Sequence, residues 1–225
     1  MDIDTLAYGD PTKEDKSLMS RKLEVLPNIK NPERMVPVPD KNSSLETEDD
    51  LIAIASLSDE LSDDEKEIID AEDINFVEST FIPYLEQNNI DYDKDEIEAA
   101  IEDVASIVMN VKYRFNRPRP AQLADFHNVK ISPREGTSAD SPSYPSGHSA
   151  QASFLARMLG DSNPKHKVNL LEMGDAVGIN RLKGNFHYPA DHEAGVDFGK
   201  KLYDLYKVSK ASDTILDKAR QTKYI

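Results

Sequence analysis

Residues 144–149 read Tyr144-Pro145-Ser146-Gly147-His148-Ser149, at the junction between a long polar loop and a helical pattern. Apolar residues then recur at helical spacing up to Leu159, so a helix is predicted to begin at about Gly147. The unpaired N–H groups in the first turn of a helix can bind an anion, and Gly147 lets that anion approach closely. A histidine held beside the anion could give a proton to a departing oxygen. Alone, this stretch could also be a Ser-capped helix start with an incidental histidine.

A second group of basic residues lies upstream, at the end of another predicted helix. Lys112 closes the apolar period of that helix, and Arg119 stands between Pro118 and Pro120 in the loop that follows. The prolines stiffen the loop, which lowers the entropy lost in holding a guanidinium in place. By itself, this cluster could equally be a basic turn that caps the preceding helix.

A third cluster lies downstream, where His187 and Asp191 are four residues apart. If a helix begins near Pro189, the carboxylate can turn back to the imidazole ring. A carboxylate on Nδ1–H would fix the tautomer that leaves Nε2 free to attack, and it would stabilise positive charge on the ring. Arg181 adds a planar, bidentate donor that suits phosphate oxygens better than lysine does. Considered alone, the His/Asp pair could be a surface ion pair.

Together the three clusters resemble, in order, the signature of the PAP2 (type 2 phosphatidic acid phosphatase) and vanadium haloperoxidase superfamily, which is K-x6-R-P, P-S-G-H and S-R-x5-H-x3-D. The chain has Lys112…Arg119-Pro120, Pro145-Ser146-Gly147-His148 and Asn180-Arg181…His187…Asp191. The resemblance covers residues 112–191 and is closest in kind to the soluble bacterial non-specific acid phosphatases. Asn180 departs from the family serine and cannot copy the geometry of a hydroxyl. Arg117-Pro118 is a competing Arg-Pro pair, but only Arg119 has the family spacing.

The resemblance implies how a phosphate group would be bound. Lys112, Arg119 and Arg181 would hold the phosphate oxygens, helped by the main chain at Ser146 and Gly147. Three cations around one dianion would stabilise the charge of a trigonal-bipyramidal transition state without a metal ion.

The resemblance also implies catalytic roles. His187 would be the nucleophile that forms a phosphohistidine, His148 the acid that protonates the leaving group, and Asp191 the residue that orients His187. No cofactor is expected for a phosphatase, whereas a haloperoxidase would use vanadate.

Charge is distributed unevenly along the 225 residues, whose formal net charge is −15. Residues 112–225 carry 18 basic and 12 acidic side chains, so an anionic ligand is expected in this half. The acidic segment 51–111 is interpreted mostly as a solvated helix face, and it argues against a general nucleic-acid binder. The predicted partner is therefore a small phosphorylated substrate.

Several sequence patterns are absent, which narrows the class of protein further. No stretch approaches the run of about 20 apolar residues that a spanning helix needs, so no integral membrane segment is predicted. The acidic N-terminus shows no secretory signal, which favours a cytoplasmic location, or the virion or host-cell cytoplasm if the source is viral. The chain has no cysteine. It also has no His-Glu-x-x-His pattern or acidic triad near its histidines, so no metal site is expected.

Two regions are expected along the chain. Residues 1–45 contain five prolines and no sustained period, which predicts an extended, partly irregular N-terminal arm. This arm could fold against the core, mediate a homo-oligomer or contact a scaffold. Residues 46–225 are predicted to form the helical domain, with helical patterns at 51–61, 65–70, 75–87, 93–111, 147–159, 165–183 and 190–207. No convincing alternating strand is seen, so the expected fold class is all-α, a helical bundle of the PAP2/haloperoxidase type.

Three functions remain open on the sequence alone. The first is a metal-independent acid phosphatase acting on phosphomonoesters, which chain length supports. The second is a vanadium-dependent haloperoxidase, in which the same cations would hold vanadate and His187 would ligate vanadium. The third is a non-catalytic structural or interaction protein that retains the fold, against which the intact His187, His148 and Asp191 argue.

Overall fold

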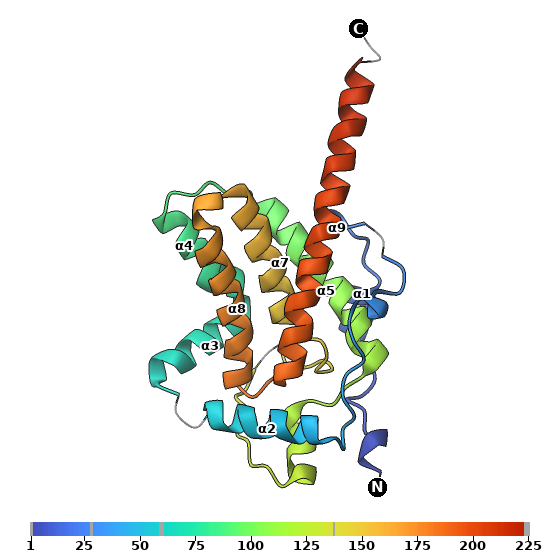
Figure 1. Cartoon of the computed structure of the whole chain (residues 1–225), viewed down its shortest axis with the longest axis vertical. Coiled ribbons are helices and arrows are strands. Elements are labelled where there is room, and N and C mark those ends of the chain that lie inside the picture. The colour runs from blue at the N-terminus through green and yellow to red at the C-terminus, as the bar shows by residue number, and fades with distance from the viewer. Residues whose placement is uncertain (1, 28, 59–60, 137, 223–225) are drawn as a thin grey trace.

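A computed structural model describes residues 2–27, 29–58, 61–136 and 138–222, with side chains up to residue 212. All regular structure within these residues is helical, which confirms the all-α prediction (Figure 1). The longer helices are α2 (Leu45–Ser58), α3 (Asp63–Phe76), α5 (Lys94–Phe115), α7 (Gly147–Ser162), α8 (Lys167–Lys183) and α9 (Pro189–Thr222). The shorter ones are α1 (Lys13–Met19), α4 (Ile82–Gln87) and α6 (Pro120–Leu123), with a π-helical turn at Val77–Phe81 and 3-10 turns at Ile3–Thr5, Pro32–Met35, Ala124–His127 and Pro164–His166. No helix among the described residues is long and apolar enough to span a membrane.

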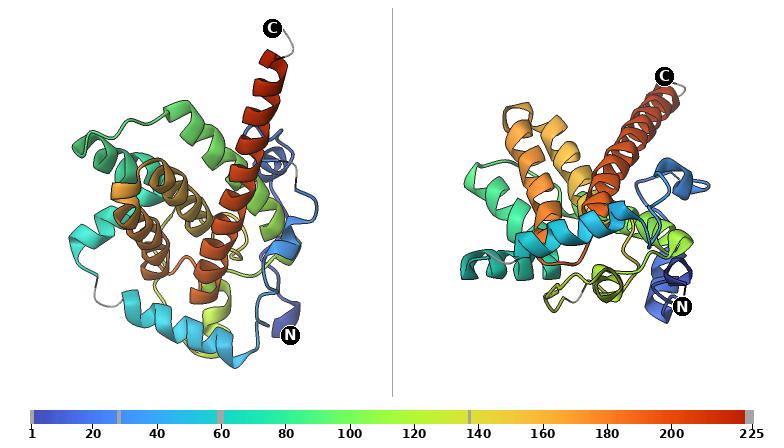
Figure 2. Two further views of the ribbon diagram at one scale, coloured as in Figure 1. Left: turned by 45° about the horizontal axis from the view of Figure 1, so that its top comes forward. Right: turned by 60° about the horizontal axis from the view of Figure 1, so that its bottom comes forward.

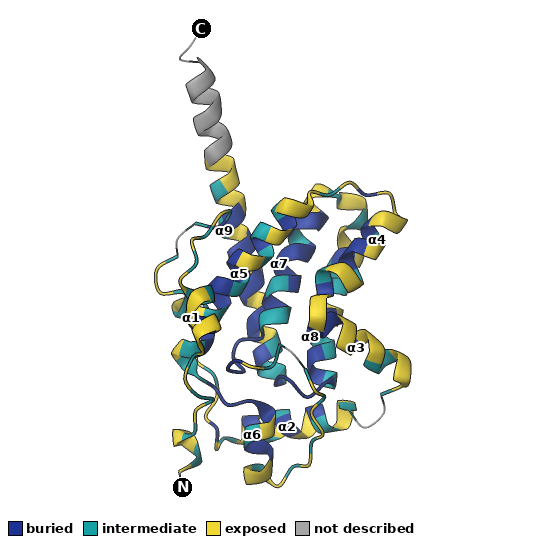
Figure 3. Ribbon diagram, turned by 180° about the vertical axis from the view of Figure 1, so that it is seen from behind, coloured by how far each residue is buried: buried dark blue, intermediate teal, exposed yellow. Residues whose placement is uncertain are grey.

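Helix α7 is the centre of the bundle and packs against α5, α8 and α9. Ten of its 16 residues are buried, and Figure 3 shows them surrounded by the other helices. Glycines on the neighbouring helices permit this close packing: a Cβ built on Gly199 of α9 would lie 2.2 Å from the Ala150 carbonyl oxygen. The N-terminal ends of α7 and α9 are therefore held side by side.

Helix α5 presents the apolar face that its sequence predicts. Ile97, Val104 and Val108 are buried. The Asp93 side chain accepts a hydrogen bond from the Glu96 amide at 3.0 Å, which confirms the predicted start of the helix. The helix continues past Lys112 and ends at Asn116, whose left-handed backbone (φ 53°) turns the chain into the basic loop.

The segment between α5 and α7 differs from the continuous loop that the sequence predicts. It contains α6 and the 3-10 turn Ala124–His127, because Pro120 occupies the first position of a helix, where its missing N–H costs nothing. The Gln122 side chain closes the turn by accepting a hydrogen bond from the Arg119 amide at 2.8 Å. Arg119 is thereby fixed at the start of α6, which lies near the start of α9 (Figure 2).

The N-terminal arm packs against the bundle, and it includes a helix that the sequence did not predict. Helix α1 begins with a capping box between Thr12 and Asp15, and it packs against α5. Further along, the buried carboxylate of Asp103 accepts hydrogen bonds from consecutive arm amides at 2.8–3.1 Å. These contacts anchor the arm along the whole of α5.

Most of the described acidic side chains of residues 51–111 are exposed, in keeping with the sequence interpretation, but three of them are buried. These three are Glu72, Asp73 and Asp103. The helical backbone of α3 is interrupted at Asn75 (φ −161°, ψ 92°), just after the two buried carboxylates. The predicted helix over residues 51–61 ends at Ser58, and residues 59 and 60 lie outside those described. At the other end of the chain, α9 continues to Thr222, beyond the predicted end at Lys207.

Candidate active site

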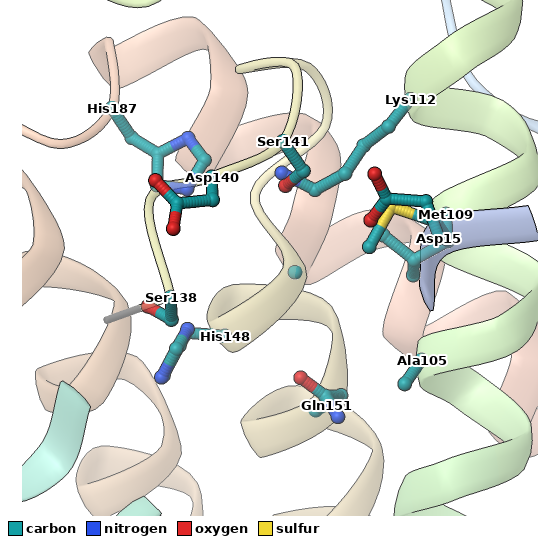
Figure 4. Close-up of a pocket in the computed structure, with 12 residues that line it drawn as sticks. Asp15, Ala105, Met109, Lys112, Ser138, Asp140, Ser141, His148, Gln151 and His187 are labelled. Atoms are coloured by element: carbon teal, nitrogen blue, oxygen red, sulfur yellow. The ribbon is translucent and has the colours of Figure 1, made fainter. Parts of the chain in front are cut away.

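A cavity of about 270 Å³ opens where α5 ends and α7 begins (Figure 4). Four predicted site residues line it, namely Lys112, Gly147, His148 and His187. Three others, Arg119, Arg181 and Asp191, lie buried behind this lining and contact it through hydrogen bonds. The fold therefore gathers the three sequence clusters around one small space.

His187 is the best-defined residue of the site, with only 2% of its surface exposed. Its Nδ1 lies 3.1 Å from Asp191 Oδ2, and its Nε2 lies 3.1 Å from Arg119 Nη1. An ionised carboxylate can only accept a hydrogen bond and a guanidinium can only donate one, so the network assigns the proton to Nδ1. Nε2 is therefore the unprotonated nitrogen of the ring, and its lone pair accepts the hydrogen bond from Arg119.

Asp191 lies in the first turn of α9, which begins at Pro189 as the sequence predicts. Its Oδ2 also accepts hydrogen bonds from the hydroxyl of Ser143 and, at 3.2 Å, from the amide of Tyr188. Burial alone would raise the pKa of Asp191, but the charge of Arg117 and the hydrogen bond from His187 hold it below its usual range. Asp191 is thus a permanently charged anchor for the imidazole.

Arg117 forms an ion pair with Asp191 and does not line the cavity. Its Nη1 lies 2.7 Å from Asp191 Oδ1, its Nη2 donates to Thr47 Oγ1 at 3.2 Å, and its guanidinium stacks 4.0 Å above the Tyr188 ring. The geometry separates the two candidate Arg-Pro pairs, because Arg119 alone reaches His187. Arg117 was considered from sequence only as a competitor of Arg119, so its contact with the carboxylate is new information.

Two buried cations face the same side of the cavity. Arg119 donates to the carbonyl oxygens of Ser141 and Phe186, at 2.7 and 2.8 Å, and Lys112 donates to that of Pro142 at 2.6 Å. Burial lowers the pKa of Arg119 to about 10, and burial together with the charge of Arg119 holds the pKa of Lys112 well below its usual value. The positive charges of Arg119 and Lys112 repel each other, and the neutral carbonyl groups offset little of this repulsion. The two side chains therefore favour an anion between them.

Arg181 is the third cation and is 1% exposed. Its Nη2 contacts Asp73 Oδ1 at 2.5 Å and Ser138 Oγ at 3.0 Å, and its guanidinium lies 3.9 Å from the Phe186 ring centre. Its Nε and Nη1 are buried and have no hydrogen-bond partner among the described residues. Buried donors of this kind are usually satisfied, so they indicate an affinity for an anion.

His148 lies in the first turn of α7, where its ring packs 5.6 Å from the ring of Phe76. Its Nε2 lies 3.2 Å from the carbonyl oxygen of Glu72. Burial and the charge of Arg181 lower the pKa of His148 to about 3. His148 is therefore neutral in the unliganded protein, and a dianion beside it would raise its pKa.

Ser146 and Gly147, the two main-chain positions predicted to bind an anion, have different roles in the structure. The Ser146 amide donates to the Asp191 carbonyl at 3.0 Å, and the Ser146 hydroxyl oxygen caps the helix by accepting from the Ser149 amide at 3.3 Å. Ser146 thus joins α7 to α9. Gly147 lines the cavity, so its amide and that of His148 are the first-turn donors nearest to a bound anion.

Asn180 lies behind the site. Its Nδ2 donates to Glu72 Oε2 at 2.9 Å, and the other oxygen of that carboxylate accepts from Thr80 Oγ1 at 2.8 Å. Glu72 of α3 also contacts the His148 ring through its carbonyl oxygen. Asn180, which replaces the family serine, therefore acts on the residue that holds His148.

Sequence reasoning missed Ser143, Ser138 and Asp73. Ser143 and Ser138 lie in the Ser/Pro-rich loop before the second cluster, and a hydroxyl so close to that cluster is a usable signal. Asp73 gives no local signal, because it lies among many acidic residues of α3. Among the described residues, no three His, Asp or Glu side chains are grouped to hold a metal ion.

Residues 100–200 match the PAP2 superfamily. This matched segment contains the three motifs that the fold gathers around the cavity, so the chain is similar to the PAP2 superfamily in this part. The chain is also 33% identical over 84 residues to an acid phosphatase of Zymomonas mobilis, covering 37% of this chain and 31% of that protein. It is 29% identical over 112 residues to a non-specific acid phosphatase of Salmonella typhimurium, covering 50% and 44%.

A similar solved structure is that of the first bacterial vanadium-dependent iodoperoxidase. It has a TM-score of 0.59 and 19% sequence identity, and the match covers 80% of this chain and 54% of that one. At this identity, the likeness establishes the shared helical fold. The chain spans less than half the length of the curated relatives named above.

Proposed function

We propose that this protein is a metal-independent acid phosphatase that hydrolyses phosphomonoesters through a phosphohistidine intermediate. The observation that carries the proposal is the pair of contacts that leaves His187 Nε2 with a lone pair, beside Arg119 and in the wall of the cavity. The similarity to two acid phosphatases supports the same reaction class.

In the first step, His187 Nε2 attacks phosphorus and the bond between phosphorus and the ester oxygen breaks. The departing oxygen takes a proton from His148, whose pKa rises when a dianion is bound. Positive charge develops on the His187 ring, and the ionised Asp191 on Nδ1 stabilises it. The products of this step are the free alcohol and a phosphohistidine.

In the second step, neutral His148 takes a proton from a water molecule, which attacks phosphorus. The bond from phosphorus to His187 Nε2 breaks, inorganic phosphate leaves and both histidines return to their starting state. Lys112, Arg119 and Arg181 would stabilise the equatorial oxygens in both steps, a role that fixed charges perform well in a dry site.

The decisive experiment is hydrolysis of p-nitrophenyl phosphate at about pH 5–6 in EDTA, by wild type and His187→Ala, with and without vanadate. We expect activity that survives chelation, is inhibited by vanadate and is lost in the variant. Activity that persists in His187→Ala would refute the phosphohistidine.

The division of roles has its own test. We expect Lys112→Ala to raise KM and the inhibition constant of phosphate while retaining measurable turnover, whereas His187→Ala abolishes turnover. Equal, small losses in the two variants would contradict this division.

A vanadium-dependent haloperoxidase is the second candidate, favoured by the fold of the iodoperoxidase. The unprotonated His187 Nε2, which accepts a hydrogen bond from Arg119, and the unpaired donors of Arg181 suit vanadate as well as phosphate. Bound vanadate would supply the oxidation of a halide by peroxide. Bromide oxidation without phosphatase activity would select this candidate, and a lack of both activities would select a structural protein.

A further inference from the structure

The candidate cavity is lined by two carboxylates as well as by basic side chains. Asp15, from α1, and Asp140, from the loop before α7, both line it. Figure 4 shows Asp140 on the side of His187, and Asp15 across the cavity beside Met109. Carboxylates repel a phosphate dianion, so their presence in a phosphate pocket needs a physical reason.

Asp15 is fixed in place and has one oxygen to spare. The residue is 9% exposed, and its Oδ2 accepts hydrogen bonds from the Thr12 amide, the Thr12 hydroxyl and the Tyr113 hydroxyl at 2.7–2.9 Å. Burial opposes ionisation, but these hydrogen bonds keep the pKa of Asp15 below its usual value. Its Oδ1 accepts no hydrogen bond from the described residues, so a charged, nearly buried oxygen remains available on the cavity wall.

Asp140 is exposed at the rim, and its carboxylate makes no hydrogen bond or ion pair with the described residues. Asp15 and Asp140 both influence the hydroxyl of Tyr8. Burial raises the pKa of Tyr8, the charge of Arg119 lowers it, and the charges of Asp140 and Asp15 raise it further. No ion pair within 4 Å joins Asp15 to Lys112 among the described residues. The charge of Lys112 helps to lower the pKa of Asp15, but the two side chains do not form a direct ion pair.

The cavity is small, and part of its lining is apolar. Ala105, Val108 and Met109 of α5 form one wall, together with Gln151 of α7, whose Nε2 donates to the carbonyl oxygen of Ile101 in α5 at 3.2 Å. A volume of about 270 Å³ admits a phosphate group and only a few further heavy atoms. A phosphate group held at Lys112 and His187 leaves Asp15, across the cavity from His187, as the carboxylate that the other end of a small ligand would reach, with Asp140 on the His187 side.

We propose that the preferred substrate is a small phosphomonoester whose alcohol carries an ammonium group, with Asp15 and Asp140 as the residues that select it. The inference rests on the proposed phosphatase function and specifies its substrate class. The ammonium would donate to Asp15 Oδ1, a charge-assisted hydrogen bond in a site that excludes most water. Asp140 would add attraction at the rim and disfavour esters with a second anionic group.

The test compares two esters that differ only in the group of interest. In 2-aminoethyl phosphate an ammonium stands where propyl phosphate has a methyl group. The quantity measured is the ratio of kcat/KM for the two esters, in wild type and in the Asp15→Asn/Asp140→Asn double variant. Because the ammonium also makes the alcohol a better leaving group, the change of this ratio between proteins is decisive. We expect the ratio to fall at least tenfold in the double variant.

The matched control is Glu14→Gln, which removes the same charge from the exposed side of α1 and should leave the ratio unchanged. A ratio that is the same in wild type and double variant, in protein that still cleaves p-nitrophenyl phosphate, would overturn the inference and leave the phosphatase intact. If wild type cleaves neither ester nor p-nitrophenyl phosphate, the proposed function itself fails. Calorimetric affinities of the two esters then decide: a preference for the ammonium ester that the double variant loses supports the ligand class, and equal affinities overturn it.

Discussion

Arg117 and Arg119 are two residues apart, yet their guanidinium groups serve different partners. The guanidinium of Arg117 contacts Asp191, and that of Arg119 contacts His187. Arg117 keeps the Asp191 carboxylate charged and in place. Arg119 lies beside the position that a phosphate oxygen would occupy.

This division predicts different defects for the same substitution. Arg117→Lys should lower kcat about tenfold or more and reduce stability by about 1–3 kcal/mol, because lysine cannot replace the contacts of the planar guanidinium with Asp191, Thr47 and Tyr188. Arg119→Lys should weaken phosphate binding about tenfold. Calorimetry with phosphate and steady-state kinetics separate the two effects. A loss of phosphate affinity in Arg117→Lys as large as in Arg119→Lys, at unchanged kcat, would reverse the assignment.

The low pKa of His148, about 3, makes a second prediction at the residue scale. A bound dianion stabilises the imidazolium, so the pKa of His148 must rise on binding and the protein should take up a proton. Sulfate is a dianion with no proton to release at pH 6, so its binding, measured calorimetrically in buffers of different ionisation enthalpy, should show net proton uptake by the protein. His148→Gln should remove most of it. Uptake that is the same in wild type and variant would show that another group carries the proton.

At the scale of elements, the site depends on two helix starts that are held together. Ser146 donates its amide to Asp191, and Gly199 of α9 lies against Ala150 of α7. The predicted helices placed His148 and Asp191 at helix N-termini, but only the packing of α7 on α9 makes them neighbours.

This packing predicts opposite outcomes for two glycine substitutions. In Gly199→Ala, the new Cβ would lie 2.2 Å from the Ala150 carbonyl oxygen, and we expect a loss of about 1–3 kcal/mol in stability. In Gly147→Ala, the nearest atoms are 3.7 Å away or more, so the fold should be kept while the methyl group in the cavity raises KM. Chemical denaturation and kinetics on both variants test this, and a stable Gly199→Ala protein would refute the close helix contact.

Helices α1 and α3 contribute to the site from outside the three motifs. Helix α3 brings Asp73 to Arg181 and the Glu72 carbonyl to His148, while α1 brings Asp15 to the cavity wall. Their sequences show acidic helix patterns that are typical of exposed surfaces. The burial of these carboxylates follows from what the helices pack against, which a local pattern does not contain.

At the scale of the whole molecule, an acidic protein encloses a cationic site. Lys112, His148 and His187 all have pKa values lowered by burial, so the fold favours their neutral forms. The unfolded chain binds protons at its histidines below about pH 6.5. Stability conferred by neutral His148 and His187 is therefore complete above that pH and declines as the pH falls toward the folded values.

We expect the unliganded protein to lose stability between pH 6.5 and 4, by about 1 kcal/mol per pH unit for each histidine. Asp50 opposes this trend: burial raises its pKa to about 6, so its contribution grows as the pH falls from 6 toward 3.8. Urea denaturation at a series of pH values measures the net slope, which Asp50→Asn should steepen. Phosphate at 100 times its dissociation constant should add about 2.7 kcal/mol. A stability that rises continuously on acidification would contradict the neutral histidines.

The sequence determined the reaction centre of this protein more completely than its surroundings. Helical periods, caps and the prolines at 118, 120 and 189 are local, so they predicted the all-α class, the starts of α5, α7 and α9, and the pairing of His187 with Asp191. These features depend on backbone geometry within a few residues. The resemblance to the family spacing favoured Arg119 over Arg117, and the structure places Arg119 against His187 and Arg117 against Asp191.

Tertiary structure alone decided which distant groups complete the site. The contacts of Asp73 with Arg181, of Arg117 with Asp191 and of Glu72 with His148 join residues 74 to 108 positions apart. The same packing placed Asp15 of the arm in the cavity wall. Such contacts depend on how helices cross and which faces they bury, and burial of a charge is decided by partners that no local pattern specifies.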